Sequence, residues 1–314
     1  MKKINSTQLI KLFITLFLIY LISLHVQPSE VYNKIKSIDL RIIFLVLLIT
    51  LFKTVLSAYR WKEILNSLNI PLPELVMIKL YFIGSFFNLF LPSNVGGDVI
   101  KAYKLNKIGN HGHLSYFSVV AERISGLIPL FILAIIGSIL SRDKQIFLFF
   151  YPAILGFISF ITATMLISNT KFIDFLTKLT RKIPLLPNTK ILIKINKATI
   201  MLLKNKKSLI KILAISFIVQ LSVAINSYLI ANSMGLNVNL QSMLVITPII
   251  ILMTTIPISL NGFGIREGSY IYLFSFIGIS ANDSLAISLT VLTVVYAVGA
   301  IGGIFYLQEK NTVI

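Results

Sequence analysis

Long apolar runs separated by short polar segments make up most of this chain. An α-helix needs roughly 20 mostly apolar residues to cross a bilayer, and six runs of the chain reach or approach that length. They lie at residues 9–24, 42–59, 116–140, 146–168, 209–231 and 285–307. The pattern predicts an all-α integral membrane protein with about six transmembrane helices.

Two further apolar segments are each interrupted by a polar turn that contains glycines. The segments are 75–107 and 240–279. In the first turn Pro92 is followed nine residues later by Lys101, and the second turn repeats this spacing with Pro257 and Arg266. Backbone that leaves a helix inside lipid must find partners within the protein or line a wet cavity. Two such breaks are therefore typical of a site at which a polar group crosses the membrane.

The charge of the chain fits a membrane protein. Its 29 Lys and Arg residues against 11 Asp and Glu residues give a net charge of +18. Because these cations gather in a few connecting segments, the positive-inside rule accounts for them, and we expect no nucleic-acid partner. Segment 169–207 carries ten of them against the single acid Asp174. It is predicted to be cytoplasmic, which places the chain in the inner (cytoplasmic) membrane of the cell.

The same rule orients the two interrupted segments. If the first enters and leaves on the cytoplasmic side, the lysines that follow its turn stay inside. Loop 232–239, which leads into the second, carries no charge, so the second is predicted to enter from the outer side. Both termini are then cytoplasmic. The predicted fold is six spans plus two re-entrant helical hairpins.

This arrangement contains an inverted repeat within a single membrane domain that covers residues 1–314. Repeat A (39–140) and repeat B (208–308) each consist of a span, a hairpin and a span, but they start on opposite sides of the membrane. In transporters built this way the substrate site lies at the interface of the repeats. We therefore expect the two turns to form one site.

The segment 169–207 that links the repeats has a helical pattern of its own. Lys190, Lys194, Lys197 and Lys204 recur at helical spacing, and apolar residues fill the opposite face. A basic amphipathic helix lies in the headgroup plane with its lysines towards anionic lipid. The linker is thus predicted to bind an anionic lipid surface. The alternative is a solvated basic loop that only fixes the topology.

The two turns carry the residue types that bind a phosphate. Glycines allow the backbone to approach a ligand closely, asparagine can cap the next helix, and the N-terminal end of a helix attracts anions. Nearby acids would balance the cations or meet a cationic headgroup; the alternative is that the charges only pair and lock the hairpins. The predicted substrate-binding residues are Asn94, Gly96, Gly97, Asp98, Lys101, Glu122, Arg123, Asn261, Gly262, Gly264, Arg266 and Glu267.

Other chemistry finds little support in the sequence. The chain has no cysteine, which excludes disulfides, thiolate metal sites and cysteine nucleophiles. His111 and His113 have no carboxylate beside them at metal-ligand spacing. No Ser-His-Asp arrangement or nucleotide-binding loop is visible. We expect no catalytic residue, no cofactor and no metal, and a transporter rather than an enzyme.

Three blocks of sequence carry a resemblance to a known family. They are Pro92 with Gly96-Gly97-Asp98 and Lys101, then Glu122-Arg123-Ile124-Ser125-Gly126-Leu127, then Pro257 with Gly262-Phe263-Gly264-Ile265-Arg266-Glu267-Gly268. From about residue 8 to 308 the chain resembles the flippase-like membrane proteins related to lysylphosphatidylglycerol synthases. In two places it departs from the family pattern: Lys101 stands where arginine is frequent, and Asn261 where glycine is frequent.

In that family the full-length synthases join an aminoacyl-transferase domain to a membrane part that moves the charged lipid between leaflets. We expect this protein to lack the transferase domain, so the resemblance implies translocation without synthesis. The leading hypothesis is a translocase for a phospholipid or a polyprenyl-phosphate-linked lipid, moving its substrate downhill or with a coupled ion. The alternatives are a membrane transferase and an accessory subunit that works with partner proteins of envelope lipid or glycan modification.

Overall fold

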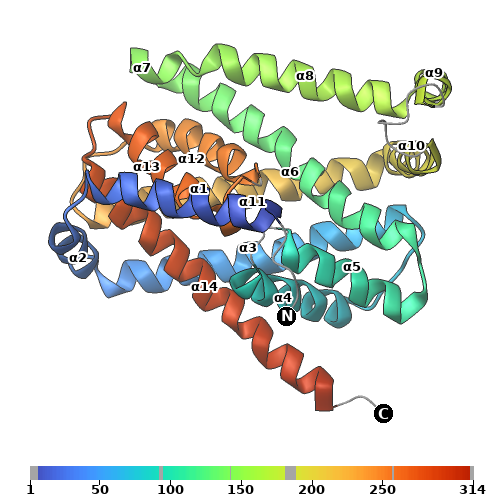
Figure 1. The fold of residues 1–314 in the computed structure, drawn as a ribbon, viewed down its shortest axis with the longest axis horizontal. Helices are drawn as coiled ribbons and strands as arrows, with labels where there is room; N and C mark the ends of the chain where they lie inside the picture. Colours follow the sequence, from blue (N-terminus) through green and yellow to red (C-terminus); the bar gives the residue numbers. More distant parts are fainter. Residues whose placement is uncertain (1–5, 92–94, 142, 181–188, 257, 312–314) are drawn as a thin grey trace.

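The structure is a computed structural model that describes residues 6–91, 95–141, 143–180, 189–256 and 258–311. These residues form helices joined by turns, and no strand occurs among them (Figure 1). Five helices are long and apolar enough to cross a bilayer. They are α3 (Leu40–Ser67), α6 (His113–Leu140), α8 (Phe150–Ser168), which follows the short α7 (Lys144–Phe147), α11 (Lys206–Ser233) and α14 (Ala281–Asn311). The prediction of an all-α integral membrane protein is confirmed.

The first predicted span is a bent pair of helices. Helix α1 (Ser6–Ser23) and helix α2 (Pro28–Lys36) meet at an angle of 84°, and together they raise the number of candidate spans to six. The bend has a local cause, because Gln27 is extended and Pro28 fits the first helical position but cannot continue a preceding helix. The side chain of Thr15 on α1 accepts a hydrogen bond of 2.9 Å from the backbone N–H of Leu260, which ties α1 to the second turn.

Both interrupted segments break where the prolines and glycines predict. Helix α4 ends at Phe90 and α5 begins at Gly96, while α12 ends at Thr255 and α13 begins only at Ile265. The elements are α4 (Glu74–Phe90), α5 (Gly96–Gly109), α12 (Leu240–Thr255), the 3₁₀ helix η1 (Leu260–Gly262) and α13 (Ile265–Ser275). Helix α4 packs on α5, and α12 packs on α13.

The two helix pairs lie towards opposite ends of the molecule. Figure 1 shows α5 reaching the end at which α9 (Thr170–Thr180) and α10 (Thr189–Lys204) lie, whereas α12 and α13 lie towards the end with α2. This is the arrangement that hairpins entering from opposite sides require. Their insertion into the membrane remains a prediction.

The two predicted repeats contact each other mainly through three pairs of helices. Helices α3 and α11 pack along each other, α4 packs on α14, and α12 packs on α6. The last two contacts each have a closely approached glycine: a Cβ on Gly302 of α14 would lie 1.9 Å from the carbonyl oxygen of Phe82, and one on Gly137 of α6 would lie 2.9 Å from that of Gln241. Small residues at such crossings let helices approach closely in a membrane. The first helix of each interrupted segment thus packs on the last span of the other predicted repeat, and the inverted repeat itself remains a prediction.

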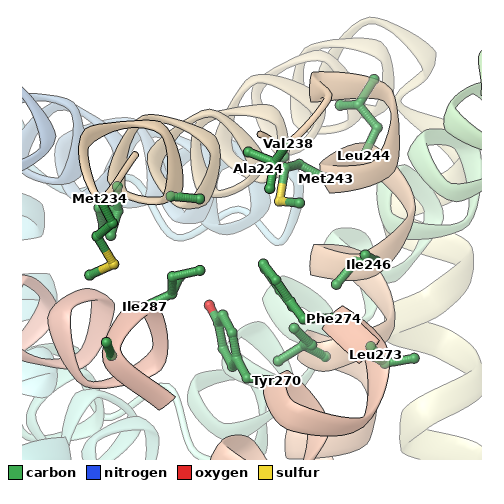
Figure 2. Packing of buried hydrophobic residues seen from close by; sticks show 14 of the residues in the cluster. Ala224, Met234, Val238, Met243, Leu244, Ile246, Tyr270, Leu273, Phe274 and Ile287 are labelled. Carbon is green, nitrogen blue, oxygen red and sulfur yellow. The ribbon is translucent and has the colours of Figure 1, made fainter. Parts of the chain in front are cut away.

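Two buried apolar clusters hold the helices together. The larger joins α12, α13 and α14 to α3, α6 and α11, and Figure 2 shows Tyr270 and Phe274 side by side within it. The rings of these two residues stack with centroids 5.4 Å apart. The other cluster surrounds Trp61 of α3, the only tryptophan of the chain, whose side chain is completely buried.

The basic linker is helical where the structure describes it. Helices α9 and α10 are seen nearly end-on in Figure 1, so they run across the direction of α8. The Asn196 amide of α10 donates a hydrogen bond of 2.8 Å to the carbonyl oxygen of Ile167 at the end of α8. Lys194 and Lys197 are exposed on α10, while Ala198 is buried. The side chain of Lys190 lies outside the described residues, and binding of this linker to a lipid surface remains a prediction.

We predict that the turn after α5 faces the cytoplasm and the turn before α12 faces outward. Because the chain has no cysteine, single cysteines at the exposed positions Lys107 and Asn239 provide an unambiguous label. In intact cells a membrane-impermeant thiol reagent should label Asn239→Cys and leave Lys107→Cys unlabelled, and permeabilised cells should label both. Labelling of Lys107→Cys alone in intact cells would contradict the topology.

Candidate functional site

The two breaks meet each other in the middle of the structure. The side-chain oxygen of Asn88, on the last turn of α4, accepts a hydrogen bond of 2.7 Å from the backbone N–H of Gly97 at the start of α5. The backbone oxygen of Asn88 accepts one of 3.1 Å from the amide of Asn261 in η1. The same amide lies 3.4 Å from the hydroxyl of Tyr296 on α14. Asparagine therefore joins the first break to the second and to the last span.

Glycine is required at both breaks, for different reasons. A Cβ on Gly97 would lie 1.9 Å from the backbone oxygen of Gly84, so α4 and α5 can approach this closely only without a side chain there. Gly264 has a φ of 81°, a conformation that residues with a Cβ rarely adopt. Asn261 has a φ of 50°, which asparagine tolerates better than most residues. The predicted site residue Asn94 lies outside the described residues.

A buried carboxylate joins four helices beside the first break. Glu122 of α6 accepts a hydrogen bond of 2.9 Å from Arg60 of α3 and one of 2.9 Å from the hydroxyl of Tyr81 on α4. Its other oxygen lies 2.7 Å from the ammonium of Lys101 on α5. The side chains of Glu122 and Lys101 are each 5% exposed. A carboxylate buried in a membrane protein is stable only when cations neutralise it, and here Arg60 and Lys101 do so.

A second carboxylate, Asp98, extends this network of charges to Arg123. Asp98 of α5 lies 3.0 Å from the ammonium of Lys101 and also pairs with Arg123 of α6. The Lys101 ammonium sits 4.4 Å from the ring centre of Tyr81 and 5.2 Å from that of Trp61, which adds cation–π attraction. The predicted residues Asp98, Lys101, Glu122 and Arg123 thus form one connected group.

The second break has its own ion pair. Arg266 places two guanidinium nitrogens 2.5 and 3.0 Å from one oxygen of Glu267. The other oxygen of Glu267 accepts a hydrogen bond of 2.7 Å from the N–H of Gly264 and so caps α13. The guanidinium also lies 5.1 Å from the ring centre of Phe263. Arg266 is held in one orientation by contacts on two sides.

A cavity of about 480 Å³ lies between the two breaks and the helices α3, α4, α6, α11, α12 and α14. Four cations line it, and no carboxylate occurs among the described lining residues. The cations are Lys53, Arg60, Arg123 and Arg266. Polar lining residues include Asn88, Gln220, Asn261 and Tyr296. The carboxylates that pair with Arg60, Arg123 and Arg266 are not among the lining residues, so the wall of the cavity carries a net positive charge.

The structure changes the assignment of three cations. Lys101 pairs with both acids of the first network and is not among the residues that line the cavity. Its place in the wall is taken by Arg60 and Lys53, which sequence reasoning left out of the site. In the sequence Arg60 stands in the basic corner Arg60-Trp61-Lys62 and is interpreted as a residue that fixes the topology. The one available signal was its position directly after the apolar run 42–59.

The long apolar helices, together with a polar and cationic cavity at the meeting point of the two breaks, define an integral membrane protein. Residues 8–303 match the family described as lysylphosphatidylglycerol synthase TM region, and the chain belongs to that family.

Two relatives align with most of this chain. It is 26% identical over 307 residues to a UPF0104 membrane protein of Pyrococcus horikoshii, with 88% of this chain and 89% of the relative covered. It is 23% identical over 285 residues to a UPF0104 membrane protein of Methanothermobacter thermautotrophicus, with 83% of each covered. The family resemblance expected from the three sequence blocks is confirmed.

Replacing Glu122 by glutamine should strongly destabilise the protein. The variant leaves the buried cations Arg60 and Lys101 without their shared counter-charge, and breaking a buried ion pair costs about 3–5 kcal/mol. Thermal unfolding in detergent measures the effect. Glu63→Gln is the control, because Glu63 pairs with Lys211 at an exposed edge, 3.3 Å apart, and such pairs contribute about 0–1 kcal/mol. Equal melting temperatures for the two variants would contradict the buried network.

The close approach at the first break predicts that even alanine is not tolerated at Gly97. The new methyl group would force α4 and α5 apart at a cost of about 1–3 kcal/mol. Gly268→Ala, on α13, is the matched control, since a Cβ there meets nothing within 4 Å. We expect Gly97→Ala to lower the melting temperature and Gly268→Ala to leave it unchanged or raise it. A Gly97→Ala variant as stable as the control would show that the helices are not in contact there.

Proposed function

We propose that this protein is a lipid translocase that moves the phosphate-bearing headgroup of a phospholipid, or of a polyprenyl-phosphate-linked lipid, between the leaflets of the cytoplasmic membrane. The observation that carries the proposal is the cavity between the two breaks, whose wall holds four cations and, among its described residues, no carboxylate. A headgroup of this kind would enter the cavity while its hydrocarbon chains stay in the bilayer. Both chain termini would face the cytoplasm.

The chemistry of the wall suits a phosphate. Arginine presents a planar fork of donors that matches phosphate oxygens, and three of the four lining cations are arginines. Arg266 is already fixed by Glu267 and Phe263, so little of its conformational freedom is lost when a ligand binds. Arg123 approaches from α6, in the other predicted repeat. The phosphate would thus be held between the two repeats.

The charge around the cavity also supports an anionic ligand. Among the described residues of the cavity and its ion pairs, five cations face three carboxylates. The surplus of positive charge in a medium of low dielectric constant would be relieved by a bound anion. We infer that the acids set the positions of the cations and that the ligand completes the neutralisation.

The inverted repeat offers a route for movement. In transporters built from such repeats, one repeat rocks against the other around a fixed site and exposes it to each side in turn. The exchanged packing of α4 on α14 and of α12 on α6 gives the two halves equivalent surfaces on which to move. The proposed motion would run down the lipid gradient or be coupled to an ion.

Arg266→Gln should abolish leaflet exchange while leaving a folded membrane protein. Loss of a charge-assisted contact to phosphate costs about 1.5–3 kcal/mol, which corresponds to a roughly ten- to hundredfold weaker binding of the headgroup. The measurement uses protein in liposomes with fluorescent anionic, zwitterionic, aminoacylated and polyprenyl-phosphate lipids. Arg266→Lys should recover part of the activity, because a point charge cannot form a bidentate contact. Lys211→Gln, which removes an exposed cation far from the cavity lining, is the matched control.

A double variant separates phosphate binding from structural pairing. If Arg266 serves only as the partner of Glu267, then Arg266→Gln with Glu267→Gln leaves no charge unpaired, and the glutamine oxygen can still cap α13. Full activity of this double variant would contradict the proposal. Continued loss of exchange, with a normal melting temperature, would support it.

A further inference from the structure

A second cavity lies on the other side of α6, towards α8 and α10. Its volume is about 440 Å³, within the range of roughly 300–1,000 Å³ that ligand pockets occupy. Its walls come from α6, α8, α10 and α11, together with Ile64 of α3. They are almost wholly apolar, and the charged residue among them is Lys194 of α10. The apolar lining residues include Phe117, Ile124, Ile128, Phe160, Ile195, Leu202, Leu203 and Leu213.

The cavity lies at the end of the molecule that is predicted to face the cytoplasmic leaflet. It is bounded by the N-terminal half of α6, the C-terminal half of α8 and the N-terminal part of α11. These parts lie at the end of the molecule where α9 and α10 run across the other helices (Figure 1). The hydrogen bond from Asn196 to Ile167 fixes α10 across the end of α8, and the exposed Lys194 of α10 is one of the lining residues.

We propose that this cavity is a binding site for an anionic phospholipid of the leaflet predicted to be cytoplasmic. One acyl chain lies among the apolar side chains, and the phosphate meets Lys194. The apolar walls accept the chain by van der Waals packing, because an acyl chain that leaves the bilayer for this cavity stays in apolar surroundings. The exposed ammonium of Lys194 attracts the negative charge, as basic residues at a membrane surface do.

This site is separate from the headgroup cavity between the breaks. The two cavities share no lining residue among those described, and α6 stands between them. Ile124 and Ser125 face the apolar cavity, whereas their neighbour Arg123 lines the cationic one. The hydroxyl of Ser125 donates a hydrogen bond of 2.8 Å to the backbone oxygen of Glu122. A bound lipid would therefore press on the same turn of α6 that carries the buried ion network, and it should stabilise that network without being transported.

Trp61 supplies a built-in reporter for occupancy. It is the only tryptophan of the chain, it is fully buried, and it belongs to the same apolar cluster as Ile64, Ala121 and Ile212, three residues that line this cavity. Titrating the detergent-purified protein with phosphatidylglycerol that carries dibrominated acyl chains should quench its fluorescence in a saturable way. Phosphatidylcholine with the same chains should quench less at equal concentration. The phosphatidylglycerol should also raise the melting temperature.

Two matched pairs of variants test the two halves of the site. Thr164→Phe places a ring in the cavity, whereas Thr162→Phe puts the same ring on an exposed face of α8 that does not line it. Lys194→Gln removes the lining cation, whereas Lys197→Gln removes an exposed cation from the same helix. We expect Thr164→Phe to abolish saturable quenching and Lys194→Gln to weaken phosphatidylglycerol binding about tenfold, while both controls behave like the unmodified protein.

Several results would contradict the proposed lipid site. Saturable quenching that survives in Thr164→Phe would mean that the chain binds elsewhere. Equal quenching by both lipids, or an unchanged affinity in Lys194→Gln, would mean that the occupant is a neutral lipid or that contact is not specific. Because Lys194 is exposed, its substitution does not endanger folding, and it keeps the test decisive if Thr164→Phe is unstable. Leaflet exchange can fail in the Arg266 variants while this binding persists, so the two proposals fail separately.

Discussion

One carboxylate placed between two cations fixes the geometry on which the rest of the site depends. Glu122 gathers Arg60 from α3, Tyr81 from α4 and Lys101 from α5 onto α6. Because an unpaired charge in this environment costs several kcal/mol, these four helices are held in the one arrangement that satisfies all partners. That arrangement leaves Arg60 at the cavity wall and sets Arg123, the next residue on α6, beside Asp98. The stability of the bundle and the charge of the cavity therefore have the same origin.

The sequence predicts the breaks in the helices well, because their causes are local. A proline next to a polar, glycine-containing turn ends a helix, so the ends of α4 and α12 could be placed from this combination. Proline alone does not suffice, because Pro129 and Pro248 lie inside α6 and α12. The apolar runs likewise predict the long helices, since each must supply about 20 residues to cross the bilayer. The bend between α1 and α2 was missed, although Pro28 marks it. The apolar run 9–24 predicted only the first of the two helices, because α2 contains many polar and charged residues.

The composition of the site could be predicted only in part, because it depends on contacts between distant segments. Glu122 and Arg60 are separated by 62 residues in the sequence, and no spacing rule links them. Lys101 and Arg266 both follow the proline of their turn by nine residues. Lys101 nevertheless pairs with carboxylates away from the cavity, whereas Arg266 lines the cavity. Packing decides this difference: α5 turns its lysine towards three other helices, while α13 holds its arginine against its own first turn. Pattern matching finds the turns, and tertiary contact decides which charges face the ligand.

Asn88 has a consequence for how the molecule can change shape. Its side chain holds the start of α5, and its backbone oxygen holds Asn261 of the other break. Any shift of α4 therefore acts on both interrupted helices at once, and neither break can move without straining a hydrogen bond to the same residue. In the proposed transport cycle, the two sides of the cavity would be coupled mechanically through Asn88.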